Sequence, residues 1–291
     1  VIPSMRSLTA EEYVEAFKTF LDHSTEHQCM DEFNKEEMPN IMAGVQGFHP
    51  FIPACLLPAD RLGEQDLKMI RILQTVHPGV FIDNEIIEPN PQHVAAYKEL
   101  VNQTADLQNV SFIWHQLTSS EYEQEVKGRG VHKKFDFIHM IQMLYRVEDI
   151  HSTIKFFHSC LDHRGKLLII ILSDSSGWAN LWKNYRHCLP PTDSGHYITS
   201  NGIMDVLKRL GLQYRVYEFP SGWDITECFI EGDPVGGLMM DFLTGTKNFL
   251  GTAPLGLRQR LQEALCQPEC SSKKDGRIIF SNNLSMIVVE S

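Results

Sequence analysis

The sequence lacks the features that would place the protein in a membrane or on nucleic acid. Its longest uninterrupted aliphatic run spans residues 167–172, whereas a membrane-spanning helix needs about 20 apolar residues. Basic residues are also few, because 26 Lys and Arg stand against 37 Asp and Glu, for a net charge of −11. So acidic a chain is poorly suited to release counterions from a phosphate backbone. We therefore expect neither a membrane nor a nucleic-acid partner.

Paired cysteines and metal-binding motifs are missing as well. The seven cysteines form no C-x2-C motif, and this odd, scattered set is typical of a reducing compartment. The thirteen histidines show no H-x3-H spacing on an expected helix, which argues against a metal site. The first six residues hold no apolar stretch of signal-peptide length, and no heptad run calls for an oligomer. We expect a cytoplasmic monomer without a bound metal.

What the sequence does contain is an alternation of apolar strands and amphipathic helices. The periodicity predicts helices at residues 8–21, 63–76, 91–104 and 150–161, and strands at residues 80–89, 110–114, 135–140 and 166–172. The last of these strands has no polar alternation, which suits burial on both faces of a parallel sheet. Strands that alternate with helices between about residues 63 and 172 favour a doubly wound α/β domain.

Two other segments are harder to assign. Residues 44–60 contain three prolines, Pro50, Pro53 and Pro58, and proline cannot donate to the ladder of a central strand. We predict an irregular segment there. Near the carboxyl terminus, β-rich runs at residues 276–281 and 284–290 flank Asn282 and Asn283, which predicts either a hairpin or a strand broken by a loop.

Glu88 is the most informative single residue. It ends an expected strand and precedes a helix that begins at Pro91. At the carboxyl edge of a doubly wound sheet, such an acid accepts hydrogen bonds from the two hydroxyls of a bound ribose. The glycine-rich loop that should lie about 20 residues upstream is absent, because residues 58–64 hold only Gly63. A solvent-facing Glu88 before a turn is therefore the alternative.

Aromatic side chains gather in the first helix and in the last third of the chain. They could line a pocket for a flat or cationic ligand, or they could form an ordinary helical core. The residues concerned are Tyr13, Phe17, Phe20, Trp178, Trp182, Tyr185, Tyr197, Trp223 and Phe242.

Several exact stretches carry a family resemblance. They include HSTEHQCM at residues 23–30, DFIHMIQMLY at 136–145, SSGW at 175–178 and SNNLS at 281–285. Together they resemble the histamine N-methyltransferase family over nearly the whole chain, except about residues 43–62. The resemblance implies one Rossmann-like class I methyltransferase unit over residues 1–291, with a smaller helical substrate lobe. The sheet core is expected at about 44–177, 200–220 and 276–291, and the lobe at about 1–43, 178–199 and 221–275.

The resemblance also implies the reaction and its residues. A methyl group would pass from S-adenosylmethionine to an imidazole nitrogen of a small amine, with histamine as the first candidate. No residue is expected as acid or base, so all roles are positioning roles. The cofactor residues implied are Glu88, Ser119, Ile141, Gly63 and His93, where the family has a glutamine in place of His93. The substrate residues implied are Glu26, Gln142 and Asn282 as hydrogen-bonding groups and Tyr13, Phe17, Phe20, Trp178, Trp182, Tyr197 and Phe242 as walls.

Arg146 is a departure that bears on the substrate. It follows Tyr145, where the family carries a second aromatic residue. An arginine would repel the ammonium group of histamine and could pair with a carboxylate, such as that of the imidazole dipeptide carnosine. The alternative is an Arg146 that points to solvent. Two other functions stay open from sequence: a catalytically inactive imidazole-binding protein, and a Rossmann-like interaction protein without an enclosed pocket.

Overall fold

The computed structural model describes residues 4–45, 63–130, 133–191 and 195–291, together with the backbone of residues 50–53. The chain divides into two compact units. Unit 1 comprises Val1–Met30, Leu172–Asn201 and Glu218–Leu284, and unit 2 comprises Asp31–Ile171, Gly202–Tyr217 and Ser285–Ser291. Residues 31–43, which the sequence associates with the substrate lobe, thus belong to unit 2.

Unit 2 is built around a mainly parallel, doubly wound sheet. The described strands form a seven-stranded sheet in the order β3-β2-β1-β4-β5-β10-β6. Pairing is parallel from β3 through β5. The strands are β1 (Pro50–Pro53), β2 (Ile82–Ile87), β3 (Val110–His115), β4 (Phe135–Ile141), β5 (Leu161–Leu172), β6 (Tyr214–Phe219) and β10 (Leu284–Glu290).

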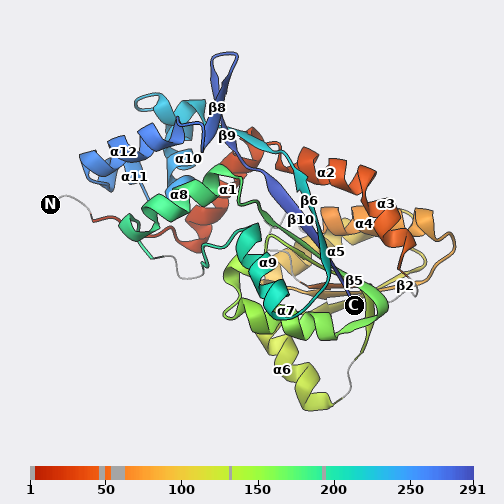
Figure 1. The fold of residues 1–291 in the computed structure, drawn as a ribbon. Helices are drawn as coiled ribbons and strands as arrows, with labels where there is room; N and C mark the ends of the chain where they lie inside the picture. The colour runs from red at the N-terminus through yellow and green to blue at the C-terminus, as the bar shows by residue number, and fades with distance from the viewer. Residues whose placement is uncertain (1–3, 46–49, 54–62, 131–132, 192–194) are drawn as a thin grey trace. The chain divides into compact units, whose positions relative to one another are not determined.

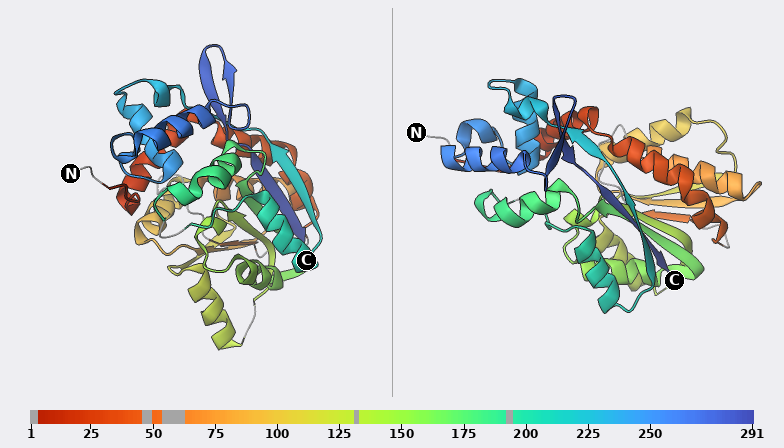
Figure 2. Two further views of the ribbon diagram at one scale, coloured as in Figure 1. Left: turned by 60° about the vertical axis from the view of Figure 1, so that its left-hand side comes forward. Right: turned by 45° about the horizontal axis from the view of Figure 1, so that its top comes forward.

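Helices cover both faces of this sheet (Figures 1 and 2). On one face lie α2 (Glu26–Glu36), α3 (Met38–Ala43), α4 (Glu64–Val76) and α5 (Pro91–Gln103), and on the other lie α6 (Ser119–Arg129), α7 (Ile150–Ser159) and α9 (Ser200–Arg209). Residues 167–172 of β5 are all buried, as expected for a strand that is covered on both faces. The predicted doubly wound α/β fold is confirmed.

The prediction that residues 44–60 are irregular is wrong for its central part. Residues 50–53 form β1, which pairs in parallel with β2 on one side and β4 on the other. The prolines are tolerated because Pro50 opens the strand and Pro53 closes it, so Phe51 and Ile52 remain as its interior donors. Residues 46–49 and 54–62, including Gly47 and Pro58, lie outside the described residues.

The hairpin alternative at the carboxyl terminus is also wrong. β9 (Arg277–Ser281) belongs to a separate three-stranded sheet, in the order β7-β9-β8, with β7 (Gly222–Asp224) and β8 (Ser271–Lys274). β10 instead lies between β5 and β6 of the large sheet. Asn282, between the two strands, is fully buried, whereas a hairpin turn would expose it. The other expected arrangement, a strand broken by a loop, describes this chain path.

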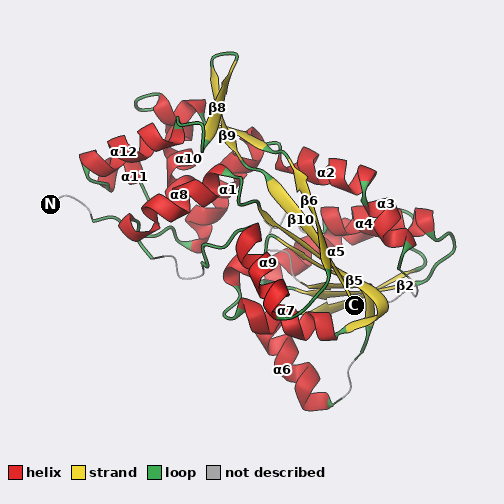
Figure 3. Ribbon diagram, in the orientation of Figure 1, coloured by secondary structure: helices red, strands yellow, loops and turns green. Residues whose placement is uncertain are grey.

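Unit 1 combines this small sheet with helices (Figure 3). Its helices are α1 (Ala10–His23), α8 (Gly177–Tyr185), α10 (Pro234–Thr244), α11 (Phe249–Thr252) and α12 (Leu255–Leu265). At the start of α1, the Thr9 hydroxyl accepts the Glu12 N–H and the Glu12 carboxylate accepts the Thr9 N–H. This reciprocal capping fixes where α1 begins and therefore which of its side chains face the core.

Candidate functional site

The carboxyl edge of the parallel sheet carries most of the predicted cofactor residues in unit 2. Glu88 follows β2, Ile141 ends β4, and Ser119 begins α6 shortly after β3. The Glu88 N–H donates to the carbonyl of His115, which ends β3, at 3.0 Å. Parallel pairing brings the carboxyl ends of these strands to one edge, which is where doubly wound sheets bind ligands.

Glu88 is buried, and only one of its two carboxylate oxygens is paired within the described residues. Its side chain is 1% exposed. Oε1 accepts the Asn90 N–H at 2.8 Å and lies 3.4 Å from Nδ1 of His93 on α5. Oε2 is buried and has no hydrogen-bond partner among the described residues. Because an unpaired buried carboxylate oxygen is costly, the free oxygen fits a ligand hydroxyl such as that of a ribose. A solvent-facing Glu88 is ruled out.

Gly63 occupies a position that suits only glycine. It precedes α4 with φ of 93°, in the left-handed region, and a Cβ there would collide with the ring of Tyr97 on α5. Ser119 is partly exposed at the first turn of α6, whereas Ile141 is buried.

Gln142 and Arg146 follow β4 in the same unit. Gln142 has a positive φ of 51°, its N–H donates to the Ile170 carbonyl at 2.9 Å, and its Oε1 accepts the Tyr145 hydroxyl at 2.9 Å. A left-handed non-glycine residue at a strand end marks a position where the surroundings hold the backbone in a costly conformation. Arg146 ends the short 3-10 turn Leu144–Arg146 and is exposed.

In unit 1, Glu26 and Asn282, two of the residues that the resemblance assigns to the substrate, are hydrogen-bonded to each other. Glu26 is 4% exposed, and its Oε2 accepts a hydrogen bond from Asn282 Nδ2 at 2.9 Å. Asn282 Nδ2 also donates to the Ser221 hydroxyl at 3.1 Å, and Asn282 Oδ1 accepts the Trp178 indole N–H at 2.9 Å. Both N–H groups of the amide are therefore occupied. Asn282 orients Glu26 and has only a carbonyl lone pair to offer a ligand.

The aromatic side chains that the resemblance assigns to the substrate lie close to one another in unit 1. Centroid distances are 6.0 Å for Tyr13 and Phe17, 5.1 Å for Phe20 and Phe242, 5.8 Å for Trp178 and Trp182, and 5.6 Å for Trp182 and Tyr197. The resemblance does not assign Trp223, yet this ring is fully buried and contacts Phe20, Trp178 and Phe242. Its indole N–H has no hydrogen-bond partner among the described residues. Its place in the general aromatic group was the only sequence signal for it.

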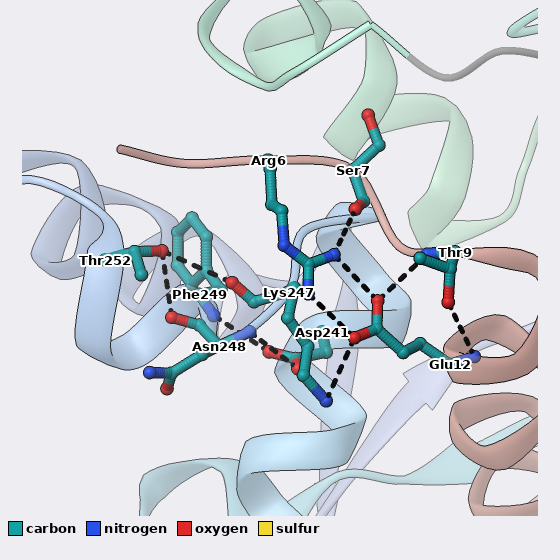
Figure 4. A network of polar contacts seen from close by, with 9 residues as sticks. All are labelled: Arg6, Ser7, Thr9, Glu12, Asp241, Lys247, Asn248, Phe249 and Thr252. Atoms are coloured by element: carbon teal, nitrogen blue, oxygen red, sulfur yellow. Dashed lines mark hydrogen bonds and ion pairs between the residues drawn. The ribbon is translucent and has the colours of Figure 1, made fainter. Parts of the chain in front are cut away.

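A polar network at the amino terminus holds two of the aromatic helices together (Figure 4). Arg6 donates to both carboxylate oxygens of Glu12 at 2.8 Å, and Lys247 Nζ lies 3.7 Å from Glu12. Asp241 accepts the N–H groups of Asn248 and Phe249, each at 2.8 Å. Burial raises the pKa of Asp241, and these two backbone hydrogen bonds partly offset that rise.

Each of the two acids in this network is followed in sequence by an aromatic residue. Glu12 precedes Tyr13 on α1, and Asp241 precedes Phe242 on α10, and these two rings lie 5.6 Å apart. The network thus helps to position these two aromatic rings.

The described residues contain no candidate metal site and no candidate membrane-spanning helix. No group of three or more His, Cys, Asp or Glu in the described ranges could hold a metal ion. No helix within those ranges is long and apolar enough to cross a membrane.

The fold and the comparisons with known proteins define the class. A family model for a methyltransferase domain matches residues 66–216. The YcgJ protein from Bacillus subtilis has a solved structure with a TM-score of 0.55 at 12% identity, covering 91% of this chain and 99% of that one, so it shares the fold. The protein is an S-adenosylmethionine-dependent methyltransferase of class I, with an α/β fold.

Sequence relatives define the family more closely. "Carnosine N-methyltransferase 2" from Gallus gallus is 79% identical over 291 residues, which cover all of this chain and 90% of the relative. "Histamine N-methyltransferase A" from Xenopus laevis is 49% identical over 288 residues, with 98% of each chain covered. The chain belongs to the histamine N-methyltransferase-like family of N-methyltransferases. The two sequence alternatives without enzymatic activity are thereby set aside.

Proposed function

We propose that this N-methyltransferase acts on the imidazole ring of a small molecule that also carries a carboxylate, with carnosine as the leading candidate. The observation that carries the proposal is Arg146. Arg146 is an exposed residue that lies four residues beyond Gln142, in the turn after β4. A guanidinium pairs with a carboxylate through two parallel hydrogen bonds. The name of the 79% identical relative from Gallus gallus points to the same substrate.

Unit 1 contains a negatively charged residue that could bind an ammonium group. Glu26 is a buried carboxylate whose position is set by Asn282, and an ammonium group would pair with it. Carnosine carries an ammonium, a carboxylate and an imidazole. Glu26 is a candidate partner for its ammonium, and Arg146, in unit 2, is a candidate partner for its carboxylate. Histamine has the ammonium and the imidazole but no carboxylate. It is the second candidate, supported by Glu26 and by relatives named histamine N-methyltransferase at 46–49% identity.

The residues of the chain would contribute binding and orientation. Gly63, Glu88, His93, Ser119 and Ile141 would hold the cofactor, with the unpaired Oε2 of Glu88 accepting a ribose hydroxyl. When bound, S-adenosylmethionine supplies an electrophilic methyl group on a sulfonium. An imidazole has a reference pKa of about 6.5 and is mostly neutral at pH 7, so its lone pair needs no general base.

Alignment and exclusion of water would then account for the acceleration. In unit 2, Gln142, held by the Tyr145 hydroxyl, is a candidate for binding the substrate. In unit 1, the grouped aromatic rings are candidates for the walls of a substrate pocket. These walls are Tyr13, Phe17, Phe20, Trp178, Trp182, Tyr197 and Phe242. Since every role is one of positioning, single substitutions should weaken the reaction without abolishing it.

The test compares two substrates in two arginine variants. We expect wild type to have a higher kcat/KM for carnosine than for histamine. Arg146→Gln should lower kcat/KM for carnosine by about tenfold, the loss of one charge-assisted contact, and leave histamine unchanged or improved. Arg209→Gln is the control, since Arg209 is exposed at the end of α9 and its substitution removes the same charge. Wild type that prefers histamine, with Arg146→Gln neutral toward both, would overturn the carnosine assignment.

A further inference from the structure

A buried polar cluster in unit 2 gathers four elements around one carboxylate. Asp66, in the first turn of α4, is 3% exposed. Its Oδ2 accepts hydrogen bonds from Asn84 Nδ2 of β2 at 3.0 Å and from the hydroxyl of Tyr97 on α5. Its Oδ1 lies 3.3 Å from Nε2 of His139 on β4. Three donors from three different elements therefore meet at a single acid.

Asp66 and Glu85, a neighbouring acid on β2, differ in the side chains that surround their carboxylates. Glu85 pairs with His115 at 3.0 Å and with Lys133, and these contacts lower its pKa despite the opposing effect of burial. No lysine or arginine in the described part of the chain contacts Asp66. Burial and the charge of Asp66 raise the pKa of Tyr97 far above its ordinary value, so the Tyr97 hydroxyl stays protonated and donates.

The cluster lowers the stability of the protein interior that contains it. Nδ1 of His139 and Oδ1 of Asn84 are buried without hydrogen-bond partners among the described residues. Burying such atoms, together with a carboxylate, costs stability that well-packed apolar residues would not cost. A role in stability alone therefore explains the cluster poorly.

Each element in the cluster leads directly to a residue assigned to the cofactor. Gly63 precedes Asp66 by three residues, Glu88 follows Asn84 by four, and Ile141 follows His139 by two. His93 lies one helical turn before Tyr97, whose ring also occupies the space that a side chain at position 63 would need. Movement of any of the three donors relative to Asp66 would displace a cofactor residue.

We propose that Asp66, with Asn84, Tyr97 and His139, forms a positioning cluster for S-adenosylmethionine. The cluster holds α4, α5, β2 and β4 in the arrangement that presents Gly63, Glu88 and His93 to the cofactor. This inference rests on the proposed assignment of those three residues. None of the four cluster residues needs to touch the cofactor itself.

The first test is Tyr97→Phe, which removes one hydroxyl and keeps the ring. Binding of S-adenosylmethionine and S-adenosylhomocysteine is measured by calorimetric titration, alongside thermal unfolding and steady-state kinetics. We expect Kd and KM for S-adenosylmethionine to rise at least about fivefold, while KM for the imidazole substrate changes less than about twofold.

The control is Ser111→Ala. It removes the 2.6 Å hydrogen bond from Ser111 to Asp83, which lies near the amino end of β2, whereas Glu88 follows its carboxyl end. This variant should lower the melting temperature without changing cofactor affinity. Cofactor affinity that stays at the wild-type value in Tyr97→Phe, with only the melting temperature lowered, would overturn the proposal.

A second pair of variants covers the case in which Tyr97→Phe does not fold. His139→Gln keeps an N–H donor toward Asp66, and His139→Leu removes it at similar volume. We expect His139→Gln to bind the cofactor within about twofold of wild type and His139→Leu to lose at least about fivefold. Equal affinity in the two variants would refute the cluster.

Glu88→Ala separates the two levels of inference. If Glu88→Ala binds S-adenosylmethionine like wild type, the assignment of the cofactor residues is wrong. If Glu88→Ala binds weakly while the Tyr97 and His139 variants bind normally, only the positioning cluster is wrong.

Discussion

Replacing Gly63 by alanine should damage the protein for two separable reasons. The first is backbone conformation, because φ of 93° is unfavourable for any residue with a Cβ, at roughly 1–2 kcal/mol. The second is steric, because the new Cβ would meet the Tyr97 ring, and overpacking costs about 1–3 kcal/mol. Alanine also lowers the conformational entropy of the unfolded chain, which stabilises the folded protein by about 0.4–1 kcal/mol and offsets part of this loss. The net destabilisation is therefore about 1–5 kcal/mol.

Two other glycines allow the contributions to be measured apart. Gly79 has φ of 79° but nothing within 4 Å of the position that a Cβ would take, so Gly79→Ala carries the conformational cost alone. Gly128 lies on α6 with neither feature, and Gly128→Ala should stabilise by about 0.5–1 kcal/mol. Since each kcal/mol shifts the melting temperature of a chain of a few hundred residues by about 2–4 °C, we expect Gly63→Ala to melt roughly 2–20 °C below wild type.

Thermal unfolding followed by circular dichroism and calorimetric titration of S-adenosylmethionine are the assays. Gly63→Ala should lose cofactor affinity as well as stability, because the start of α4 moves with it. A melting temperature equal to that of Gly79→Ala would refute the steric contact with Tyr97. Unchanged cofactor affinity would refute the placement of Gly63 in the cofactor site.

Three further outcomes are expected. Arg6 holds the pKa of Glu12 at about 2, so the stability that this pair provides is complete above the ordinary pKa near 4.5 and is lost as the pH falls toward 2. Glu12→Gln should remove this part of the acid sensitivity, which is less than about 1 kcal/mol for a partly exposed pair. Melting curves from pH 7 to 2 measure it. Trp178→Phe removes the N–H that Asn282 accepts and should lower kcat/KM for the imidazole substrate about tenfold; unchanged steady-state kinetics would exclude the orienting role. Ile169→Ala, at a fully buried position of β5, should cost about 2–5 kcal/mol in denaturant unfolding, and a smaller loss would mean that the sheet interior repacks.

Most helices and strands could be predicted because their signals are local. The periodicity that predicts a helix over residues 63–76 corresponds to Glu64–Val76, and the prediction over 91–104 corresponds to Pro91–Gln103. The β8–β9 hairpin was missed although a signal was present. Asp275 and Gly276 both have positive φ, at 51° and 74°, and Asp-Gly between two strands is typical of a two-residue hairpin turn.

β1 shows where a local rule misleads. Proline disfavours a central strand, but only the interior of the ladder needs the missing N–H. A strand of four residues with prolines at both ends keeps its interior donors, and the strands on either side supply the pairing. Composition could not reveal this, because the neighbours β2 and β4 come from residues 82–87 and 135–141.

The class of fold can be inferred from the amino-acid sequence alone, and so can the kinds of residue at the strand ends, such as Glu88 after β2. These properties follow from periodicity and from the order of elements along the chain. The pairing of polar groups, by contrast, is visible only once the chain is folded: Asn282 pairs with Glu26 and Trp178, and Asp66 pairs with His139. Such hydrogen bonds join residues as many as 256 positions apart. They depend on how helices pack on sheets to within a fraction of an ångström, which local propensity does not encode.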